Sequence, residues 1–166
     1  MTMLEERLRQ AHARHVAGDL EEAERRYRSI LDGSPAHPDA LRLLGSICGQ
    51  TGRLDQAAWY LERAVEADPS VVEAHYNLGV VRREQGRSEE AIAAWDRAVQ
   101  ADPAHASAWF NRAVVLADLG RDHEARATLA RAVEAAPGHA GMHHQLALLE
   151  YAAGEHEAAA QPGALP

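Results

Sequence analysis

The chain has 166 residues, 46% of them hydrophobic and 25% charged, with a formal net charge of −8 at pH 7. This composition suits a folded protein. An acidic chain without a basic stripe is not expected to bind nucleic acid, because phosphate binding depends on clustered cations. No segment reaches the roughly 18 to 20 apolar residues that cross a bilayer, and the first ten residues lack the apolar core of a signal peptide. One cysteine, Cys48, cannot form an internal disulfide. We therefore expect a cytoplasmic protein with no membrane contact.

A spacing of 34 residues recurs from one end of the chain to the other, as between Gly18 and Gly52. A period of this length predicts a stack of two-helix repeats. The recurring positions are glycines, alanines and prolines: Gly18, Gly52, Gly86, Gly120 and Gly154; Ala23, Ala57, Ala91, Ala125 and Ala159; Pro35, Pro69, Pro103 and Pro137.

The spacing predicts a single repeat domain over residues 4–161, followed by a flexible tail at 162–166. Its first repeat places Arg7, Gln10 and Arg14 where the repeat pattern calls for apolar residues, as is typical of a terminal repeat with one solvated face. The predicted repeats are 4–37, 38–71, 72–105, 106–139 and a partial fifth at 140–161.

The third repeat shows the local signals most clearly. Apolar residues at helical spacing predict a first helix over residues 73–85. Gly86 is expected to end it in the left-handed conformation, and Ser88 to cap the second helix. Asp102-Pro103 should end that second helix, because a residue before proline avoids helical backbone angles. Each repeat is therefore expected to be a helical hairpin.

Small residues should lie where the two helices of a hairpin approach most closely, as Gly79, Ala91 and Ala98 do in the third repeat. Large residues such as Leu78 and Trp95 then fill the remaining space. The equivalent small residues are Gly45, Ala57 and Ala64 in the second repeat and Ala113, Ala125 and Ala132 in the fourth.

The fifth repeat is incomplete. Leu146, Leu149 and Tyr151 should lie on a first helix that covers the fourth hairpin, whereas the second helix has only residues 155–161 before Pro162. Such an incomplete lid would expose apolar surface, and exposed apolar surface tends to find a partner. Self-association through this carboxyl-terminal repeat is therefore one expectation.

These residues resemble the tetratricopeptide repeat. The third repeat matches its pattern at His75, Leu78-Gly79, Ala91, Trp95, Ala98 and Pro103, and Trp109 matches the first bulky position of the fourth. The resemblance implies an all-α fold, a right-handed α-solenoid of tandem helix-turn-helix units. It also extends to the repeat arrays that precede catalytic domains in bacterial O-GlcNAc transferase-like and sulfotransferase proteins. The chain departs from the pattern where an aromatic is expected in the middle of the first helix, so we expect that contact to be weakened; the residues there are Arg14, Cys48, Arg82, Leu116 and Glu150.

In the resembled family the first helices line a concave surface, which is the candidate binding groove. Aromatic residues are frequent anchors at interfaces, and a side-chain amide can donate to and accept from a peptide bond at once. We therefore expect the groove to hold an extended peptide, with arginines choosing its acidic groups. The alternative is that the asparagines only satisfy local backbone groups. The predicted groove residues are Arg42, Tyr76, Asn77, Val80, Arg83, Phe110, Asn111, Val114 and Gln145.

Other chemistry has little support in the sequence. There is no glycine-rich phosphate loop, nucleophile elbow or metalloprotease motif, so no enzyme and no cofactor are expected. His12 and His15 lie three residues apart but lack a third metal ligand. The basic residues of a clamp for chaperone tails are also missing. The favoured hypothesis is a non-catalytic scaffold or adaptor that binds a protein or peptide in the groove. The alternatives are an accessory substrate-delivery subunit of a separately encoded modifying enzyme, and a self-assembling structural protein.

Overall fold

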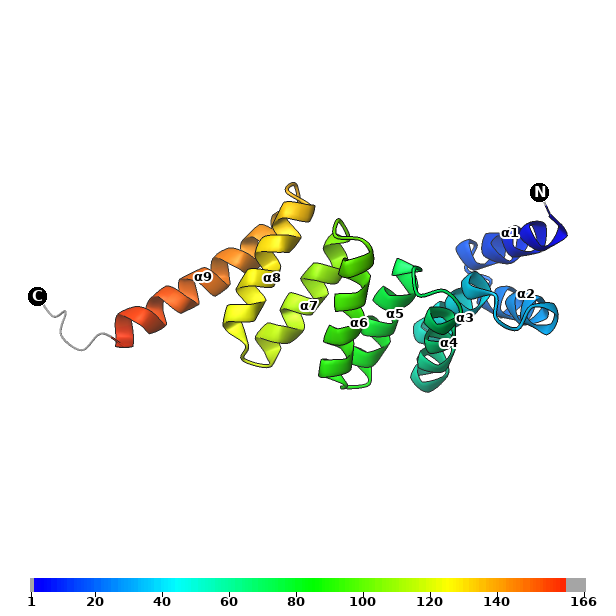
Figure 1. Ribbon diagram of the computed structural model, residues 1–166, viewed down its shortest axis with the longest axis horizontal. Helices are drawn as coiled ribbons and strands as arrows, with labels where there is room; N and C mark the ends of the chain where they lie inside the picture. Colours follow the sequence, from blue (N-terminus) through cyan, green and yellow to red (C-terminus); the bar gives the residue numbers. More distant parts are fainter. Residues whose placement is uncertain (1, 161–166) are drawn as a thin grey trace, which may run out of the picture. The chain divides into compact units, whose positions relative to one another are not determined.

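The structure is a computed structural model that describes residues 2–160, with side chains described as far as Tyr151. All regular elements among these residues are α-helices (Figure 1). Consecutive helices pair as hairpins, α1 with α2, α3 with α4, α5 with α6 and α7 with α8. The predicted all-α repeat fold is therefore confirmed. The helices are α1 (Met3–Val16), α2 (Leu20–Gly33), α3 (Pro38–Gln50), α4 (Leu54–Ala67), α5 (Val72–Glu84), α6 (Ser88–Ala101), α7 (Ala106–Asp118), α8 (Asp122–Ala135) and α9 (Ala140–Ala160).

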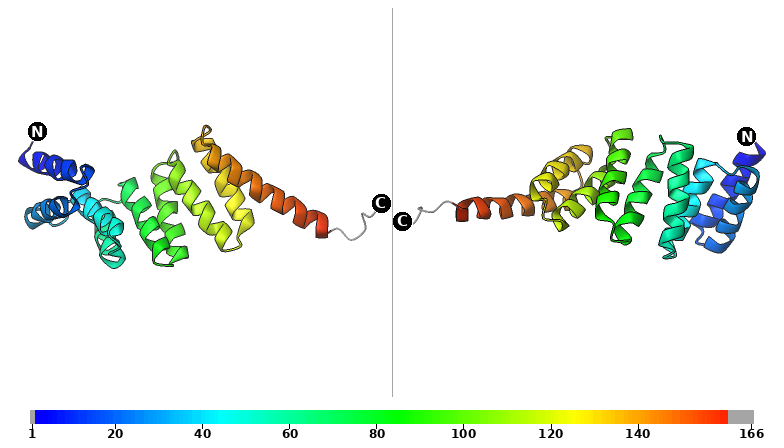
Figure 2. Two further views of the ribbon diagram at one scale, coloured as in Figure 1. Left: turned by 180° about the vertical axis from the view of Figure 1, so that it is seen from behind. Right: turned by 60° about the horizontal axis from the view of Figure 1, so that its bottom comes forward.

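The helices fall into two compact units, and the boundary between them in the chain lies between Ala101 and Asp102. The first contains three hairpins, α1 to α6, in which α2 packs on α3 and α4 packs on α5 (Figure 2). The second contains the hairpin of α7 and α8 and the single helix α9, which packs on α8.

Each predicted hairpin turn from Gly18 to Gly120 has the same geometry. Gly86 has a φ of +74°, which only a residue without a side chain adopts at low cost. The amide of Arg87 donates to the carbonyl of Arg82 at 2.8 Å, and the amide of Gly86 donates to that of Arg83 at 2.9 Å. These two bonds satisfy carbonyls at the end of α5 and turn the chain back. One detail differs from the prediction: α6 already begins at Ser88, so Ser88 lies inside the helix and is not its cap.

Histidines cap several first helices. Nδ1 of His105 accepts a hydrogen bond from the amide of Ala108 at 3.1 Å, and His37 and His139 act in the same way on α3 and α9. An acceptor at this position satisfies one of the free amides at the start of a helix. These histidines therefore have a structural role.

Small residues close the hairpins as predicted. Gly79 on α5 is buried against the Trp95 ring, and a Cβ atom at Gly79 would lie 2.6 Å from Cδ1 of Trp95. A Cβ atom at Gly45 on α3 would likewise lie 2.6 Å from Cγ of Leu61. Both distances are too short for any real methyl group, so the large residue on the second helix depends on the glycine on the first.

Arg82 corrects the expectation of a weakened contact at the missing aromatic position. Its side chain is buried on α5 and pairs with Glu62 of α4. It also lies 3.4 Å from the carboxylate of Glu90 on α6 and donates to the Gln85 side chain at 2.9 Å. An arginine thus connects three consecutive helices at this position.

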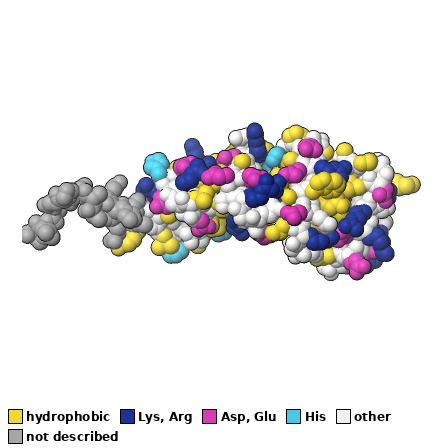
Figure 3. Space-filling view, turned by 90° about the horizontal axis from the view of Figure 1, so that it is seen from below, with side chains coloured by type: hydrophobic (Ala, Val, Ile, Leu, Met, Phe, Trp, Pro, Cys, Tyr) yellow, Lys and Arg dark blue, Asp and Glu magenta, His cyan; other side chains and the backbone are white. Residues whose placement is uncertain are grey.

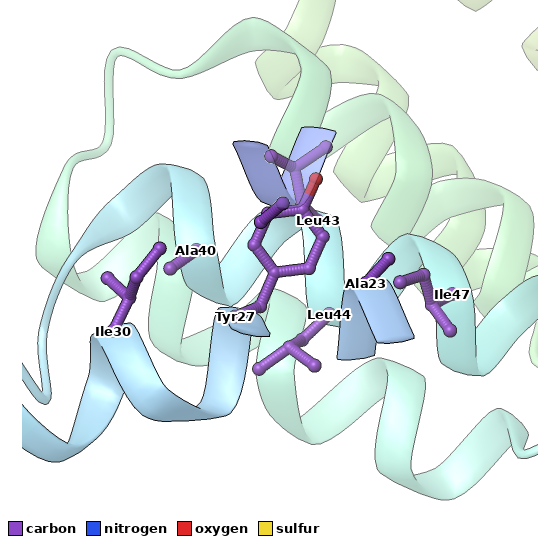
Figure 4. Packing of buried hydrophobic residues seen from close by; sticks show 8 residues of the cluster. Ala23, Tyr27, Ile30, Ala40, Leu43, Leu44 and Ile47 are labelled. Atoms are coloured by element: carbon purple, nitrogen blue, oxygen red, sulfur yellow. The ribbon is translucent and has the colours of Figure 1, made fainter. Parts of the chain in front are cut away.

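The first two hairpins share an apolar core around Tyr27 of α2, which is fully buried between α1 and α3 (Figure 4). Arg7, one of the polar residues expected to be solvated, is half-buried and donates from its guanidinium to the Ser29 carbonyl at 2.7 Å. The core residues are Ala11, Ala23, Tyr27, Ile30, Ala40, Leu43, Leu44 and Ile47.

The fifth repeat differs from the prediction. Instead of turning at Gly154, α9 continues as one helix from Ala140 to Ala160. Leu146 and Leu149 pack on the core of the fourth hairpin, as expected, but Tyr151 is 69% exposed. The expected tail at 162–166 lies outside the described residues.

Candidate peptide-binding groove

The first helices α3 and α5 contact each other within the first unit. Between them lies a cavity of about 280 Å³. Its lining residues are Gly45, Ser46, Gly49, Gln50, Leu61, Tyr76, Asn77, Val80, Val81 and Glu84.

The floor of the cavity is apolar and owes its depth to a glycine. Leu61 is fully buried and Val81 nearly so. Gly49 leaves the space above Val81 open, because a Cβ atom there would lie 3.6 Å from Cγ2 of Val81, an ordinary contact distance. The cavity is therefore a hollow between two helices that a methyl group would partly fill.

The rim of the cavity carries hydrogen-bonding side chains. Nε2 of Gln50 donates to Oγ of Ser46 at 3.2 Å and also lies 3.2 Å from Nε2 of His15 on α1. Asn77 and Glu84 line the α5 side. A polar rim around an apolar floor is the usual arrangement of sites that bind a ligand in a fixed orientation.

Two buried polar groups lie behind this rim. His15 packs edge-on against Tyr27 with ring centroids 6.2 Å apart, and neither Nδ1 of His15 nor the Tyr27 hydroxyl has a partner among the described residues. Burial lowers the pKa of His15, and the hydrogen bond from Gln50 opposes that effect. Burial raises the pKa of Tyr27 to about 12. Burial therefore favours the uncharged form of both side chains.

The structure brings three of the predicted groove residues together. Tyr76, Asn77 and Val80 all line the cavity. Arg42 lies on α3 but outside the cavity lining, 3.5 Å from the carboxylate of Asp39. Arg83 is exposed on α5 and is also not part of the lining.

The other predicted residues belong to the second unit. Phe110 on α7 is half-buried in the core of the fourth hairpin, with its ring centroid 6.3 Å from that of His139. Asn111 and Val114 are half-buried on the same helix, and Gln145 is exposed on α9. Phe110 is thus partly a core residue of its own unit.

Sequence reasoning did not single out Gln50 and Glu84, which occupy equivalent places in the second and third repeats. The 34-residue spacing between them was a usable signal, because the last turn of a first helix also faces the groove. Their place in the cavity depends on the hollow beside Gly49, and the sequence at any one position does not predict that hollow.

The outer surface offers a second exposed feature. Trp59 on α4 is 51% exposed, and the Arg63 guanidinium lies 4.5 Å from its ring centroid. Figure 3 shows one face of the first unit, on which hydrophobic side chains are bordered by arginines. Because the Arg63 guanidinium lies over the Trp59 ring, this exposed tryptophan does not line a cavity.

The described part of the chain shows neither a metal-binding site nor a reactive thiol. These residues hold no group of three or more His, Cys, Asp or Glu side chains able to bind a metal ion. Cys48 is buried on α3, and burial raises the pKa of its thiol, which disfavours the reactive thiolate. No helix within residues 2–160 has the length and apolar character that a membrane crossing requires.

The sequence pattern of the tetratricopeptide repeat matches residues 8–72, 49–99 and 76–140. The chain belongs to the tetratricopeptide repeat family. No curated protein matches the chain. Tetratricopeptide repeat proteins bind protein or peptide partners, and their repeat scaffold is generally non-catalytic.

Solved structures agree with this assignment. YrrB, described as a tetratricopeptide repeat protein with an unusual peptide-binding site, is 25% identical over 81% of this chain and 70% of its own, with a TM-score of 0.72. A MamA structure is 24% identical over 87% of this chain and 84% of its own, with a TM-score of 0.80, a likeness of fold. The O-GlcNAc transferase of Thermobaculum terrenum is 28% identical over 81% of this chain but only 27% of its own, with a TM-score of 0.73.

Proposed function

We propose that this tetratricopeptide repeat protein is a non-catalytic adaptor that holds an extended segment of a partner protein against its first helices. The observation that carries the proposal is the cavity between α3 and α5, where Tyr76, Asn77 and Val80 meet Ser46 and Gln50. Its apolar floor suits a side chain of the partner, and its amides suit the partner's backbone.

The second unit carries similar residues at equivalent repeat positions. Phe110, Asn111 and Val114 on α7 and Gln145 on α9 are proposed to contact the bound segment there. The proposal also places the protein in the cytoplasm, since its one cysteine is buried and has no second cysteine to pair with.

The test is capture of partners from the native lysate, comparing the wild type with the double variant Tyr76→Ala, Asn111→Ala. Trp59→Ala is the matched control, because Trp59 is an exposed aromatic of the same unit outside the cavity. The double variant should lose the partner, and the control should keep it. If the double variant still binds the partner and Trp59→Ala does not, the binding surface would instead lie on α4.

A second candidate function is an accessory subunit that delivers substrate to a separate modifying enzyme. The likeness to 27% of the O-GlcNAc transferase chain favours it. Capture of an enzyme that requires Tyr76 and Asn111 would support this function, whereas capture of a non-enzyme would favour the adaptor.

Self-association through α9 is the third proposal. Leu148 is 49% exposed and Tyr151 is 69% exposed on this helix. Light scattering at rising concentration should show a mass increase that Leu148→Glu with Tyr151→Glu abolishes. A constant monomer mass would contradict it.

A further inference from the structure

We infer that the cavity between α3 and α5 selects a lysine or arginine side chain of the bound segment. Glu84 is the one charged residue among the ten that line this cavity. The inference rests on the proposed function, because it names the residue class that the same site prefers.

Glu84 is available to a ligand. It is exposed at the end of α5 and makes no ion pair with the residues that the structure describes. The adjacent Arg83 does not line the cavity, since neighbouring residues on a helix point in different directions.

The charged and titratable groups of the neighbouring helices leave this carboxylate uncompensated. On α3, Arg42 is placed beside Asp39. On α1, His15 contacts the side-chain amide of Gln50, which carries no charge. Burial lowers the pKa of His15. Arg82 on α5 is committed to Glu62 and Glu90 on the neighbouring second helices.

The rest of the lining matches the shape of a long basic side chain. Lysine and arginine bury an aliphatic stem on apolar surface while their charged end stays in water. Val80, which is partly exposed, offers that apolar surface, and the missing side chain of Gly49 leaves room for the stem. A basic head group would then meet the exposed carboxylate of Glu84, with Gln50 and Asn77 at the rim for the peptide backbone.

An acidic side chain fits this cavity poorly. A carboxylate placed there would face Glu84 without a cation in the lining. Arg42 and Arg83, which the sequence suggested would bind acidic groups of the peptide, do not line this cavity.

The experiment titrates blocked pentapeptides, Ac-Ala-Ala-X-Ala-Ala-NH2, into the full ¹⁵N-labelled chain, with X as lysine, arginine, norleucine or glutamate. Amide shifts in residues 45–50 and 76–84 report binding. The lysine and arginine peptides should bind about fivefold more tightly than the norleucine peptide, the upper range for an exposed ion pair. This preference should shrink in high salt.

Two variants assign the preference to one carboxylate. Glu84→Gln, which keeps the shape, should bring the lysine and norleucine peptides to equal affinity. Arg83→Gln, the neighbouring control, should keep the difference. Equal affinities in the wild type, or a tighter glutamate peptide, would overturn the inference while leaving peptide capture intact. Absence of shifts with every peptide would overturn both.

Discussion

The indole nitrogen of Trp95 donates a hydrogen bond to the carbonyl oxygen of Tyr76 at 3.2 Å. Trp95 is fully buried and closes the third hairpin, whereas Tyr76 lines the candidate groove. The packing of the hairpin thus fixes the backbone of a binding residue.

Gly79→Ala should therefore damage both stability and the groove. The added methyl group would overlap the Trp95 ring, which cannot move without losing its bond to Tyr76. We expect a loss of about 1–3 kcal/mol in the free energy of unfolding. Urea unfolding followed by circular dichroism measures it, and an unchanged midpoint would show that the ring has room to shift.

Gly49→Ala makes the opposite prediction on the neighbouring first helix. Its methyl group would meet Val81 at an ordinary distance, and alanine is the better helix former. We expect stabilisation of about 0.5–1 kcal/mol. The same methyl group narrows the cavity, so the affinity for the lysine pentapeptide should fall. A variant that is more stable and binds equally well would argue against the hollow as the site.

Substitutions at Arg82 test whether this arginine stabilises the position where the repeat pattern has an aromatic residue. Arg82→Ala removes a buried stem and its pairing with Glu62 and Glu90, so we expect a loss of about 1–2 kcal/mol. The estimate is modest because both carboxylates are about half exposed. Arg82→Met keeps the packing of the stem and should recover part of the loss. Equal melting temperatures for wild type and Arg82→Ala would contradict the role.

Tyr27→Phe should be neutral or stabilising at pH 7, because the buried hydroxyl has no partner among the described residues. The change also alters the response to alkali. An unfolded tyrosine titrates near about pH 10, whereas the pKa of Tyr27 in the fold is raised to about 12. The unfolded state therefore loses its proton first, and stability falls as the pH rises from about 10 to about 12. Thermal unfolding across this range should show a shallower decline for Tyr27→Phe.

His15 predicts a loss of stability on the acid side. Burial lowers its pKa in the fold below the usual value of 6.5, so the unfolded state binds the proton first as the pH falls. The stabilisation is complete above that value and is lost as the pH falls through it toward the lowered pKa. Melting temperatures at pH 7.5 and 5.5 should differ less for His15→Leu than for the wild type. An equal difference would assign the acid sensitivity to other groups.

Part of the candidate site was predictable from local spacing. Tyr76, Asn77 and Val80 were expected on the inner face of one helix, and all three line the cavity. Arg42 and Arg83 were expected there too, but they lie outside the lining. Helical periodicity predicts which face a residue occupies, but it does not predict the hollow that neighbouring helices leave between them.

The sequence by itself determined the hairpins. Gly86 ends α5 because its left-handed φ is a property of one residue, and Gly79 marks the closest approach because any side chain there would meet Trp95. Only the tertiary structure decided what the irregular positions do. Arg82 is buried because Glu62 and Glu90 come from different helices to meet it, and α9 continues through Gly154, where a glycine in a helix costs only about 1 kcal/mol relative to alanine. Such outcomes depend on contacts between residues far apart in the chain, which a repeat spacing does not contain.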